Sequence, residues 1–180
     1  MSDWLQSIVD VEVRDGDAVE LAEKLRAWLI ETGILVAELD DEGHHRPGPR
    51  HAEAYQEPSD QEVDGGEFVV RRHWYDGLDP ATVTCAGCGA ATPLHDEHYV
   101  DNEAGDAMYD AAQAWLGGAG HQSCGHCGHV NGLNDWTWAP PNAFGALGIT
   151  FWGWPPLSTD FVDRVGELRG HRVVYVPSSL

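Results

Sequence analysis

The chain has 180 residues, of which 42% are hydrophobic and eight are tryptophan. This composition indicates one folded domain, or one domain with an insert, and excludes an intrinsically disordered chain. Thirty acidic and ten basic residues give a formal net charge of −20. No stretch approaches the roughly 20 apolar residues of a membrane-spanning helix. Residues 1–30 lack the basic start and apolar run of an export signal, so we expect a soluble, cytoplasmic protein.

The N-terminal residues predict a strand with one face in water. Apolar and acidic side chains alternate near the end of residues 4–13, and alternation with period two places them on opposite faces of a strand. The expected buried face carries Val9, Val11 and Val13. The expected solvent-exposed face carries Asp10 and Glu12.

A helix is predicted to follow this strand. Asp17 with Glu20 three residues later resembles a capping box, which satisfies backbone N–H groups at a helix start. An apolar stripe with helical spacing comes next, and Gly33 is placed to end the helix. The stripe consists of Leu21, Ala22, Leu25, Trp28 and Leu29.

Residues 34–66 have the composition of a loop. Apart from a short strand-like pattern at 34–36, they are acidic and contain several prolines and glycines, so we expect a mobile connection with an exposed His44-His45 pair. Residues 68–75 are aromatic and β-branched and predict a strand. Arg71 and Arg72, which are adjacent on that strand, are expected to pair with some of the surplus carboxylates.

All four cysteines occur in two similar five-residue segments, which begin at Cys85 and Cys124. Two residues separate the cysteines of each pair, so a tight turn can point both thiolates at one place. A glycine follows each pair and lets backbone N–H groups turn toward the sulfurs. Two such turns supply the four sulfurs of a closed tetrahedral zinc site, which has no open position for a catalytic water. We therefore predict one structural Zn²⁺. Its predicted ligands are Cys85, Cys88, Cys124 and Cys127.

Three other uses of the cysteines remain open. Two disulfides would need an oxidising compartment, for which the sequence has no export signal. A redox pair would be single and would begin a helix after a strand, whereas this chain has two pairs that are each followed by glycine. Another metal could also take the same four sulfurs.

The two cysteine segments resemble the knuckles of a zinc ribbon, and the resemblance covers about residues 83–130. It implies a structural metal but does not indicate a particular function. The 35 residues between Cys88 and Cys124 exceed the spacing of a compact finger. Residues 106–116 have helical spacing and end at Gly117-Gly118, so a short helix is expected between the knuckles.

Four histidines near these segments are further candidate ligands. His95 and His98 could share a metal on a helix, but Pro93 and the residues that follow do not establish one, so a polar loop is favoured. His126 and His129 could each replace a cysteine, although four thiolates make that unnecessary.

The cysteine region has no lysine or arginine. Between Arg72 and Arg164 the chain contains eleven acidic residues and neither lysine nor arginine. Because phosphate contacts depend on lysine and arginine, we expect no nucleic-acid binding by this region. The acidic surface either keeps the protein soluble or binds a basic protein partner.

The last part of the chain predicts a strand, a helix and a closing strand. Residues 147–152 form an apolar strand, Ser158 or Thr159 caps the helix, Gly170 ends it, and residues 171–176 form the last strand. The elements in chain order predict an α+β fold of ferredoxin-like order (βαββαβ) with a zinc-ribbon insert between its second and third strands. The expected parts of this one composite domain are 1–75, 76–145 and 146–180.

The sequence contains no phosphate-binding loop, no Gly-x-Ser-x-Gly elbow and no His-Glu-x-x-His motif. Ser158 is expected to be a helix cap before it is a nucleophile. A non-enzymatic interaction protein, comparable to bacterial immunity proteins that neutralise toxins, is therefore preferred. Its tryptophans would anchor the partner, or else would form the core of the insert. The alternative is a small enzyme with a site between sheet and insert. Its best groups are Asp135, Arg71, Arg72 and His73.

Overall fold

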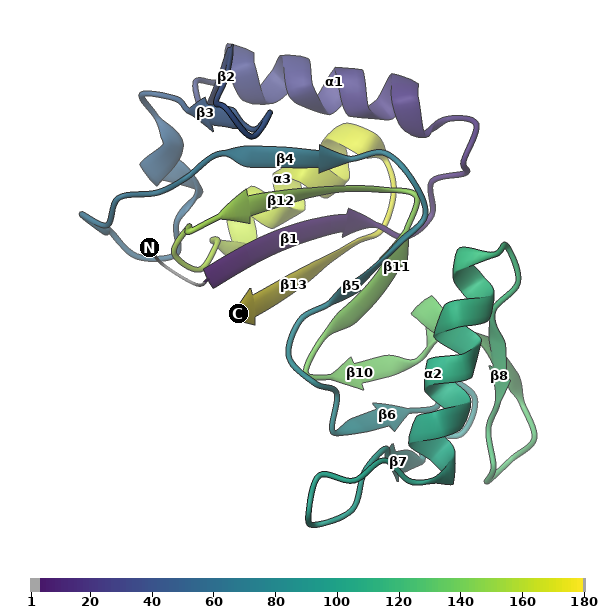
Figure 1. Ribbon diagram of the computed structural model, residues 1–180. Coiled ribbons are helices and arrows are strands. Elements are labelled where there is room, and N and C mark those ends of the chain that lie inside the picture. The colour runs from purple at the N-terminus through teal and green to yellow at the C-terminus, as the bar shows by residue number, and fades with distance from the viewer. Residues whose placement is uncertain (1–3, 180) are drawn as a thin grey trace. The chain divides into compact units, whose positions relative to one another are not determined.

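The computed structural model describes residues 4–179, and its fold is mixed α/β with three α-helices and several antiparallel sheets (Figure 1). The chain divides into two units. The first unit contains Met1–His73 and Gly145–Leu180, and the second contains Trp74–Phe144. None of the three helices within residues 4–179 has the length and hydrophobicity needed to cross a membrane.

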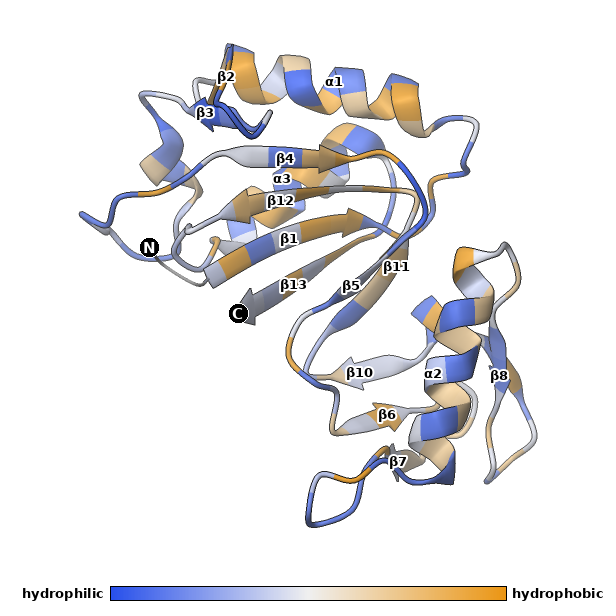
Figure 2. Ribbon diagram, viewed as in Figure 1, coloured by the Kyte–Doolittle hydropathy of each residue, from blue (hydrophilic) through white to orange (hydrophobic). Residues whose placement is uncertain are grey.

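A six-stranded antiparallel sheet forms the first unit, with the strands in the order β13-β1-β12-β4-β3-β2. Strand β12 is mostly apolar, and β1 and β4 combine hydrophobic and hydrophilic residues, as the orange and blue segments in Figure 2 show. The sheet consists of β1 (Trp4–Asp10), β2 (Leu35–Leu39), β3 (His45–Pro47), β4 (Gly66–Val69), β12 (Leu147–Trp152) and β13 (Val173–Ser179).

Two helices cover one face of this sheet. Helix α1 (Ala18–Glu31) and helix α3 (Thr159–Arg169) share one hydrophobic cluster with β1 and β12, and Trp28 of α1 stacks on Phe161 of α3 with ring centroids 6.1 Å apart. Their ends lie close to where the sequence predicts them. The Ser158 hydroxyl accepts a hydrogen bond from the Phe161 N–H, and Gly170 has a φ of 66°. Asp17 precedes α1, but its side chain makes no capping hydrogen bond.

The prediction that Asp10 lies on a solvent-exposed face of the first strand is wrong. Asp10 is fully buried, and its carboxylate lies 3.1 Å from Nη1 of Arg169 and 3.0 Å from Nδ1 of His171. Strand β1 lies between β12 and β13 in the middle of the sheet, and every side chain from Gln6 to Asp10 is buried. An acid in an alternating pattern therefore marks a buried ion pair here.

Residues 34–75 contain more regular structure than the sequence predicts. Strand β3 and a short 3₁₀ helix, η1 (His51–Ala54), lie in the expected loop. His45 is buried, with Nδ1 2.9 Å from the Val36 carbonyl oxygen, so the expectation of an exposed histidine pair is wrong. The single strand predicted at 68–75 is two strands, because β4 ends at Val69 and β5 (His73–Asp76) begins after a bend.

The expected pairing of an arginine with surplus carboxylates is confirmed. Nε of Arg72 lies 3.0 Å from the Asp15 carboxylate, and both residues belong to the first unit.

The second unit consists of short strands around one helix. A three-stranded sheet has the order β10-β6-β7, and two further two-stranded sheets pair β5 with β11 and β8 with β9. Helix α2 (Glu103–Leu116) lies between the two cysteine segments in the chain, and Asn102 caps it through hydrogen bonds from Ala104 and Gly105. The strands are β6 (Thr82–Thr84), β7 (Ala91–Pro93), β8 (His121–Ser123), β9 (Val130–Gly132), β10 (Thr137–Ala139) and β11 (Asn142–Gly145), and η2 (Leu133–Asp135) is a 3₁₀ turn.

The second unit has its own hydrophobic cluster. Trp136 and Trp138 are 5% and 7% exposed, and Trp138 packs against the fully buried Phe144. The sequence leaves open whether these tryptophans anchor a partner or form the core of the insert. In the structure they belong to the core. Two of the four cysteines, Cys85 and Cys124, belong to the same cluster, so the sulfur site and the core of this unit are continuous.

The mixed α/β class is confirmed, but the specific ferredoxin-like order is not. The sheet has six strands where that order has four, because β2 and β3 extend its edge beyond β4.

Candidate metal centre

Each cysteine pair lies in the turn of a two-stranded hairpin. Cys85 and Cys88 lie between β6 and β7, whose last paired residues are Thr84 and Ala91. Cys124 and Cys127 lie between β8 and β9, which meet at the pair of Ser123 and Val130. Both turns therefore contain six residues, and the two hairpins present the same backbone shape to the same point.

The two turns also share their hydrogen bonds. The N–H of Gly89 donates to the Cys85 carbonyl oxygen at 2.9 Å, and the N–H of Gly128 donates to that of Cys124 at 2.8 Å. Both glycines have a positive φ, 72° and 73°, a conformation that L side chains rarely adopt. The glycine after each cysteine pair is thus required by the turn, as the sequence pattern predicts.

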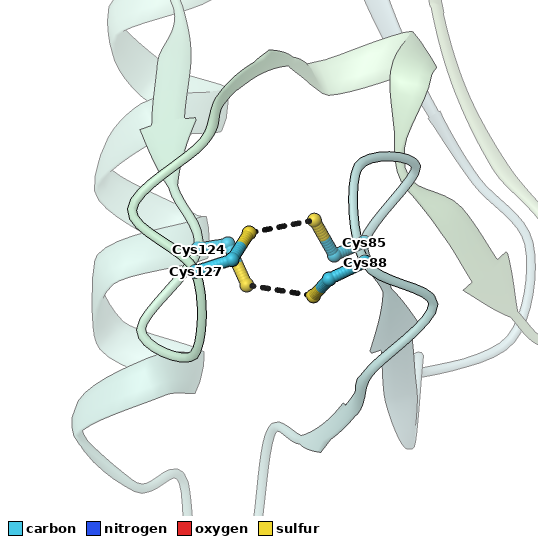
Figure 3. A group of neighbouring side chains, drawn as sticks. All are labelled: Cys85, Cys88, Cys124 and Cys127. Carbon is cyan, nitrogen blue, oxygen red and sulfur yellow. Dashed lines mark hydrogen bonds between the residues drawn. The ribbon is translucent and has the colours of Figure 1, made fainter.

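The four sulfurs converge on one point. Sγ of Cys85 lies 3.9 Å from Sγ of Cys127, and Sγ of Cys88 lies 3.8 Å from Sγ of Cys124. Figure 3 shows the two turns facing each other, with the side chains directed inward and these two sulfur pairs joined by dashed lines. All four sulfurs lie within 4.8 Å of one another, so they could hold a metal ion.

These distances fit metal ligation and do not fit disulfides. A disulfide has an S–S length of about 2.05 Å, and all four cysteines are free. Four thiolates around one Zn²⁺ at about 2.3 Å form a tetrahedron whose edges are about 3.8 Å long. The two short sulfur pairs match that edge. The donor set and its geometry therefore fit a four-coordinate thiophilic metal.

The inner half of the site is buried and holds the hydrogen bonds to sulfur. Cys85 and Cys124 are buried, whereas Cys88 and Cys127 are exposed. Sγ of Cys85 accepts hydrogen bonds from Nδ2 of Asn131 at 3.4 Å and from the N–H of Gly87 at 3.3 Å. Asn131 is itself 1% exposed. A fixed side-chain donor of this kind orients a ligand and stabilises its thiolate.

These surroundings give the sulfurs different acidities in the metal-free chain. Burial raises the pKa of Cys85, but the hydrogen bonds from Asn131 and the backbone outweigh burial and lower the pKa to about 6. For Cys88 a backbone hydrogen bond from Ala90 lowers the pKa, but the neighbouring sulfurs and burial raise it to about 12. Because a metal binds thiolates, ligation at this site releases protons.

The nearby histidines take no part in the sulfur cluster. His126 and His129 are exposed, and the His129 ring lies against Gly87 of the first turn. His95 and His98 lie in a loop as expected, where Nδ1 of His95 is 3.1 Å from the Asp96 carbonyl oxygen. Within residues 4–179 the four cysteines are the one group of three or more potential ligands that the structure brings together.

The side chains of Asp135, Ser158 and Arg72 make contacts that stabilise the fold. The Asp135 carboxylate is exposed and accepts a hydrogen bond from the N–H of Gly132 at 3.1 Å, which closes the turn at η2. Ser158 caps α3, and Arg72 pairs with Asp15. None of these contacts builds a nucleophile with a positioned base.

Two features of the second unit escaped sequence reasoning. No sequence motif predicts that Asn131 donates a hydrogen bond to sulfur. Its position two residues after His129 indicates only that it belongs to the second hairpin. The other feature is a pair of exposed aromatic residues, Tyr99 and Tyr109, which are 79% and 55% exposed. Periodicity places Tyr109 on the outer face of α2, but only the structure shows what lies beside it.

The sequence matches no protein-family model, and neither curated proteins nor solved structures give a significant match.

Proposed function

We propose that this protein is a non-enzymatic zinc-binding interaction protein whose second unit, residues 74–144, binds a basic protein partner. The observation that supports the partner is the distribution of charge in this unit. It contains nine acidic residues and no lysine or arginine, and all nine side chains are exposed. They are Asp76, Asp79, Asp96, Glu97, Asp101, Glu103, Asp106, Asp110 and Asp135.

Zinc is the metal that the sulfur cluster suits best. Four thiolates in a closed tetrahedral set are typical of structural zinc, and the ligand spacing resembles that of a zinc ribbon. Four thiolates and one Zn²⁺ carry a formal charge of −2, so the bound metal would make this unit more acidic still. One Zn²⁺ per chain would then support both the fold of the unit and its charge.

The exposed acids would act mainly on the rate of association. In the second unit, Nδ1 of His98 lies 3.8 Å from the Glu97 carboxylate, and this is a charged pair only when the histidine is protonated. A surface of one charge sign attracts a partner of the opposite sign over a distance set by the ionic strength. Such steering raises association rates, often by tenfold or more.

Apolar side chains of the same unit could supply the affinity that charge does not. Tyr99, Val100 and Tyr109 are each more than half exposed. Trp136 and Trp138 are buried and so cannot be the first contacts of a partner. Exposed aromatic residues with an acidic surround suit a partner that offers both basic and apolar groups, as a toxin bound by an immunity-like protein would.

We also propose how the chain is organised. In this proposal the strands β13-β1-β12-β4, together with α1 and α3, would correspond to a ferredoxin-like domain with split βαβ halves, and β2 and β3 would be an addition to its edge. In this proposal the halves are residues 1–75 and 146–180, and residues 76–145 are a zinc-ribbon insert within one composite domain. The cytoplasm, where thiols remain reduced, suits the free cysteines.

Association with the partner is expected to depend steeply on salt and on the acids of the second unit. The variant Asp96→Asn, Glu97→Gln, Asp101→Asn and Glu103→Gln should lower the association rate constant several-fold at low salt. Raising the salt to 0.5 M, where the Debye length is about 4 Å, should slow the unchanged protein to a similar rate. The measurement is surface plasmon resonance with the partner, identified by affinity capture and mass spectrometry.

A matched control tests whether position matters as well as charge. The variant Glu57→Gln, Asp60→Asn, Glu62→Gln and Asp163→Asn removes the same number of negative charges, four, from exposed positions of the first unit. It should slow association much less than the second-unit variant. Equal effects of the two variants, or no effect of either, would contradict a binding role for residues 74–144.

Nucleic-acid binding is expected to be negligible. The second unit has no lysine or arginine to contact phosphates, and the chain as a whole carries a net charge of −20. In fluorescence anisotropy with labelled DNA and RNA at about 0.15 M salt, we expect no binding up to about 100 μM protein. Micromolar affinity that weakens steeply with salt would overturn the charge argument.

A further inference from the structure

A pocket of about 230 Å³ lies within the second unit, between β5, α2 and β10. Aromatic and apolar side chains form its inner wall, and exposed acids form its rim. The wall includes Trp74, Met108, Tyr109 and Trp138, and the rim includes Asp76, Asp79 and Asp101. The pocket is distinct from the sulfur site, since none of the four cysteines lines it.

The two indoles of the wall are held in fixed positions. Nε1 of Trp74 donates to Oδ1 of Asn142 at 2.9 Å, and its ring stacks on Phe144 with centroids 5.7 Å apart. Nε1 of Trp138 donates to the Leu133 carbonyl oxygen at 2.9 Å. With their N–H groups engaged in the protein, both rings are held in place as apolar parts of the pocket wall.

The third aromatic residue of the wall belongs to the exposed face of α2. Tyr109 is 55% exposed, and its ring stands edge-on to Trp74 with centroids 6.0 Å apart. Helix α2 can lie this close to the strands because of Gly105, where a Cβ would come within 2.1 Å of the Leu94 carbonyl oxygen. The pocket therefore depends on a close approach that only glycine permits at this position.

The charge of the pocket has one sign. Its three aspartates are exposed, and no lysine or arginine occurs anywhere in residues 74–144 to neutralise them. Leu78, which lies between the lining residues Gly77 and Asp79, is 47% exposed, and Val100 beside Asp101 is 60% exposed. Apolar groups thus extend the rim outward as a surface on which a polypeptide could lie.

We propose that this pocket binds an arginine side chain of the partner. This inference rests on the proposed function, in which the partner is basic, and it identifies the group that the partner inserts. A flat guanidinium can stack on the indole and phenol rings and donate paired hydrogen bonds to carboxylates at the rim. The volume is below the roughly 300–1,000 Å³ of usual small-molecule sites, so it suits one side chain.

The test uses the zinc-loaded protein of residues 1–180 and a single blocked amino acid as the probe. In NMR spectra of the ¹⁵N-labelled protein, Nα-acetylarginine amide should shift the indole N–H signals of Trp74 and Trp138, with a dissociation constant on the order of 1 mM. Nα-acetylcitrulline amide has nearly the same shape without the charge and should cause no shift. Nα-acetyllysine amide should bind about threefold more weakly because ammonium lacks the planar fork.

Two variants with matched controls separate the rim from the wall. Asp76→Asn with Asp79→Asn should weaken the arginine probe about fivefold, whereas Asp110→Asn, an exposed acid on α2 outside the pocket lining, should leave it nearly unchanged. Tyr109→Leu should weaken binding about threefold without changing the charge. Tyr99→Leu, at another exposed tyrosine outside the lining, should not.

The outcomes separate this inference from the proposed function. If the arginine probe leaves both indole signals in place, or if the citrulline probe shifts them equally, the pocket does not bind guanidinium and the inference is overturned. A basic partner that still binds residues 74–144 in that case keeps the proposed function. If the probe binds as expected but no basic partner associates, guanidinium binding by the pocket is supported and the proposed function is contradicted.

Discussion

Replacing Cys124 with serine is expected to abolish zinc binding and to unfold residues 74–144, while the six-stranded unit keeps its structure. Zinc binding to structural cysteine sites contributes about 10–16 kcal/mol of apparent free energy. A serine hydroxyl is a poor replacement for a thiolate, so the variant would leave three sulfurs that cannot close the site. The unchanged protein should contain one Zn²⁺ per chain.

The structure explains why the effect should be large for this unit. Its paired strands are mostly three residues long, and small sheets of this kind are not stable by themselves. Cys85 and Cys124 lie in the same hydrophobic cluster as Phe144 and Trp138, so loss of the metal also disturbs the core. The six-stranded unit has a separate cluster that contains no cysteine.

Zinc content by elemental analysis and ¹H–¹⁵N NMR spectra of both proteins test this expectation. In the variant, the signals of residues 74–144 should collapse to the narrow range of an unfolded chain, and those of the first unit should remain dispersed. His126→Gln is the matched control, because His126 lies within the second turn but is exposed and outside the sulfur cluster. Full zinc content in Cys124→Ser, or loss of zinc in His126→Gln, would mean that the ligand set is wrong.

Replacing Asp10 with asparagine is expected to destabilise the six-stranded unit by about 3–5 kcal/mol, because it removes a buried carboxylate that pairs with the buried guanidinium of Arg169. The side chain of Arg169 is 2% exposed and that of Asp10 is 0% exposed. Oδ1 of Asp10 also accepts hydrogen bonds from the N–H groups of Glu12 and Val13. Asparagine retains an acceptor oxygen for those bonds, so the variant mainly removes the charge.

The free energy of unfolding, measured by urea denaturation, tests the buried pair against an exposed one. Asp15→Asn removes the partner of Arg72, and since Asp15 is 61% exposed, the loss should be below about 1 kcal/mol. Adding Arg169→Met to Asp10→Asn should recover part of the lost stability, because it removes the buried charge that the first substitution leaves uncompensated. A loss below about 1 kcal/mol for Asp10→Asn would show that the buried charge is compensated elsewhere.

Elements whose signals are local were predictable from the sequence. Helix α3 has its hydroxyl cap, its apolar stripe and its terminal glycine within about a dozen consecutive residues, and β12 is a continuous apolar run. The two cysteine turns are equally local, since each needs two cysteines, a spacing of two and a following glycine. In all these cases the residues that cause the structure are neighbours in the chain, so their order alone predicts it.

The position of a strand within a sheet depends on residues far away in the chain. The sequence alone predicts that Asp10 is exposed. In the structure β1 lies between β12 and β13, and the Asp10 carboxylate contacts Arg169 and His171. Strand β3 is similar, because its short sequence becomes a strand by pairing with β2 and β4. Periodicity shows which side chains share a face, but it does not show what covers that face.

The sequence by itself therefore determined the three helices, the two cysteine turns and the charge of the region around them. Only the tertiary structure decided which acids are buried, that Trp136 and Trp138 belong to the core, and that a pocket exists at all. The pocket brings together residues from β5, the turn after it, α2 and β10, which span positions 74–138. Burial and cavities are consequences of packing between distant segments, and local spacing carries no record of those contacts.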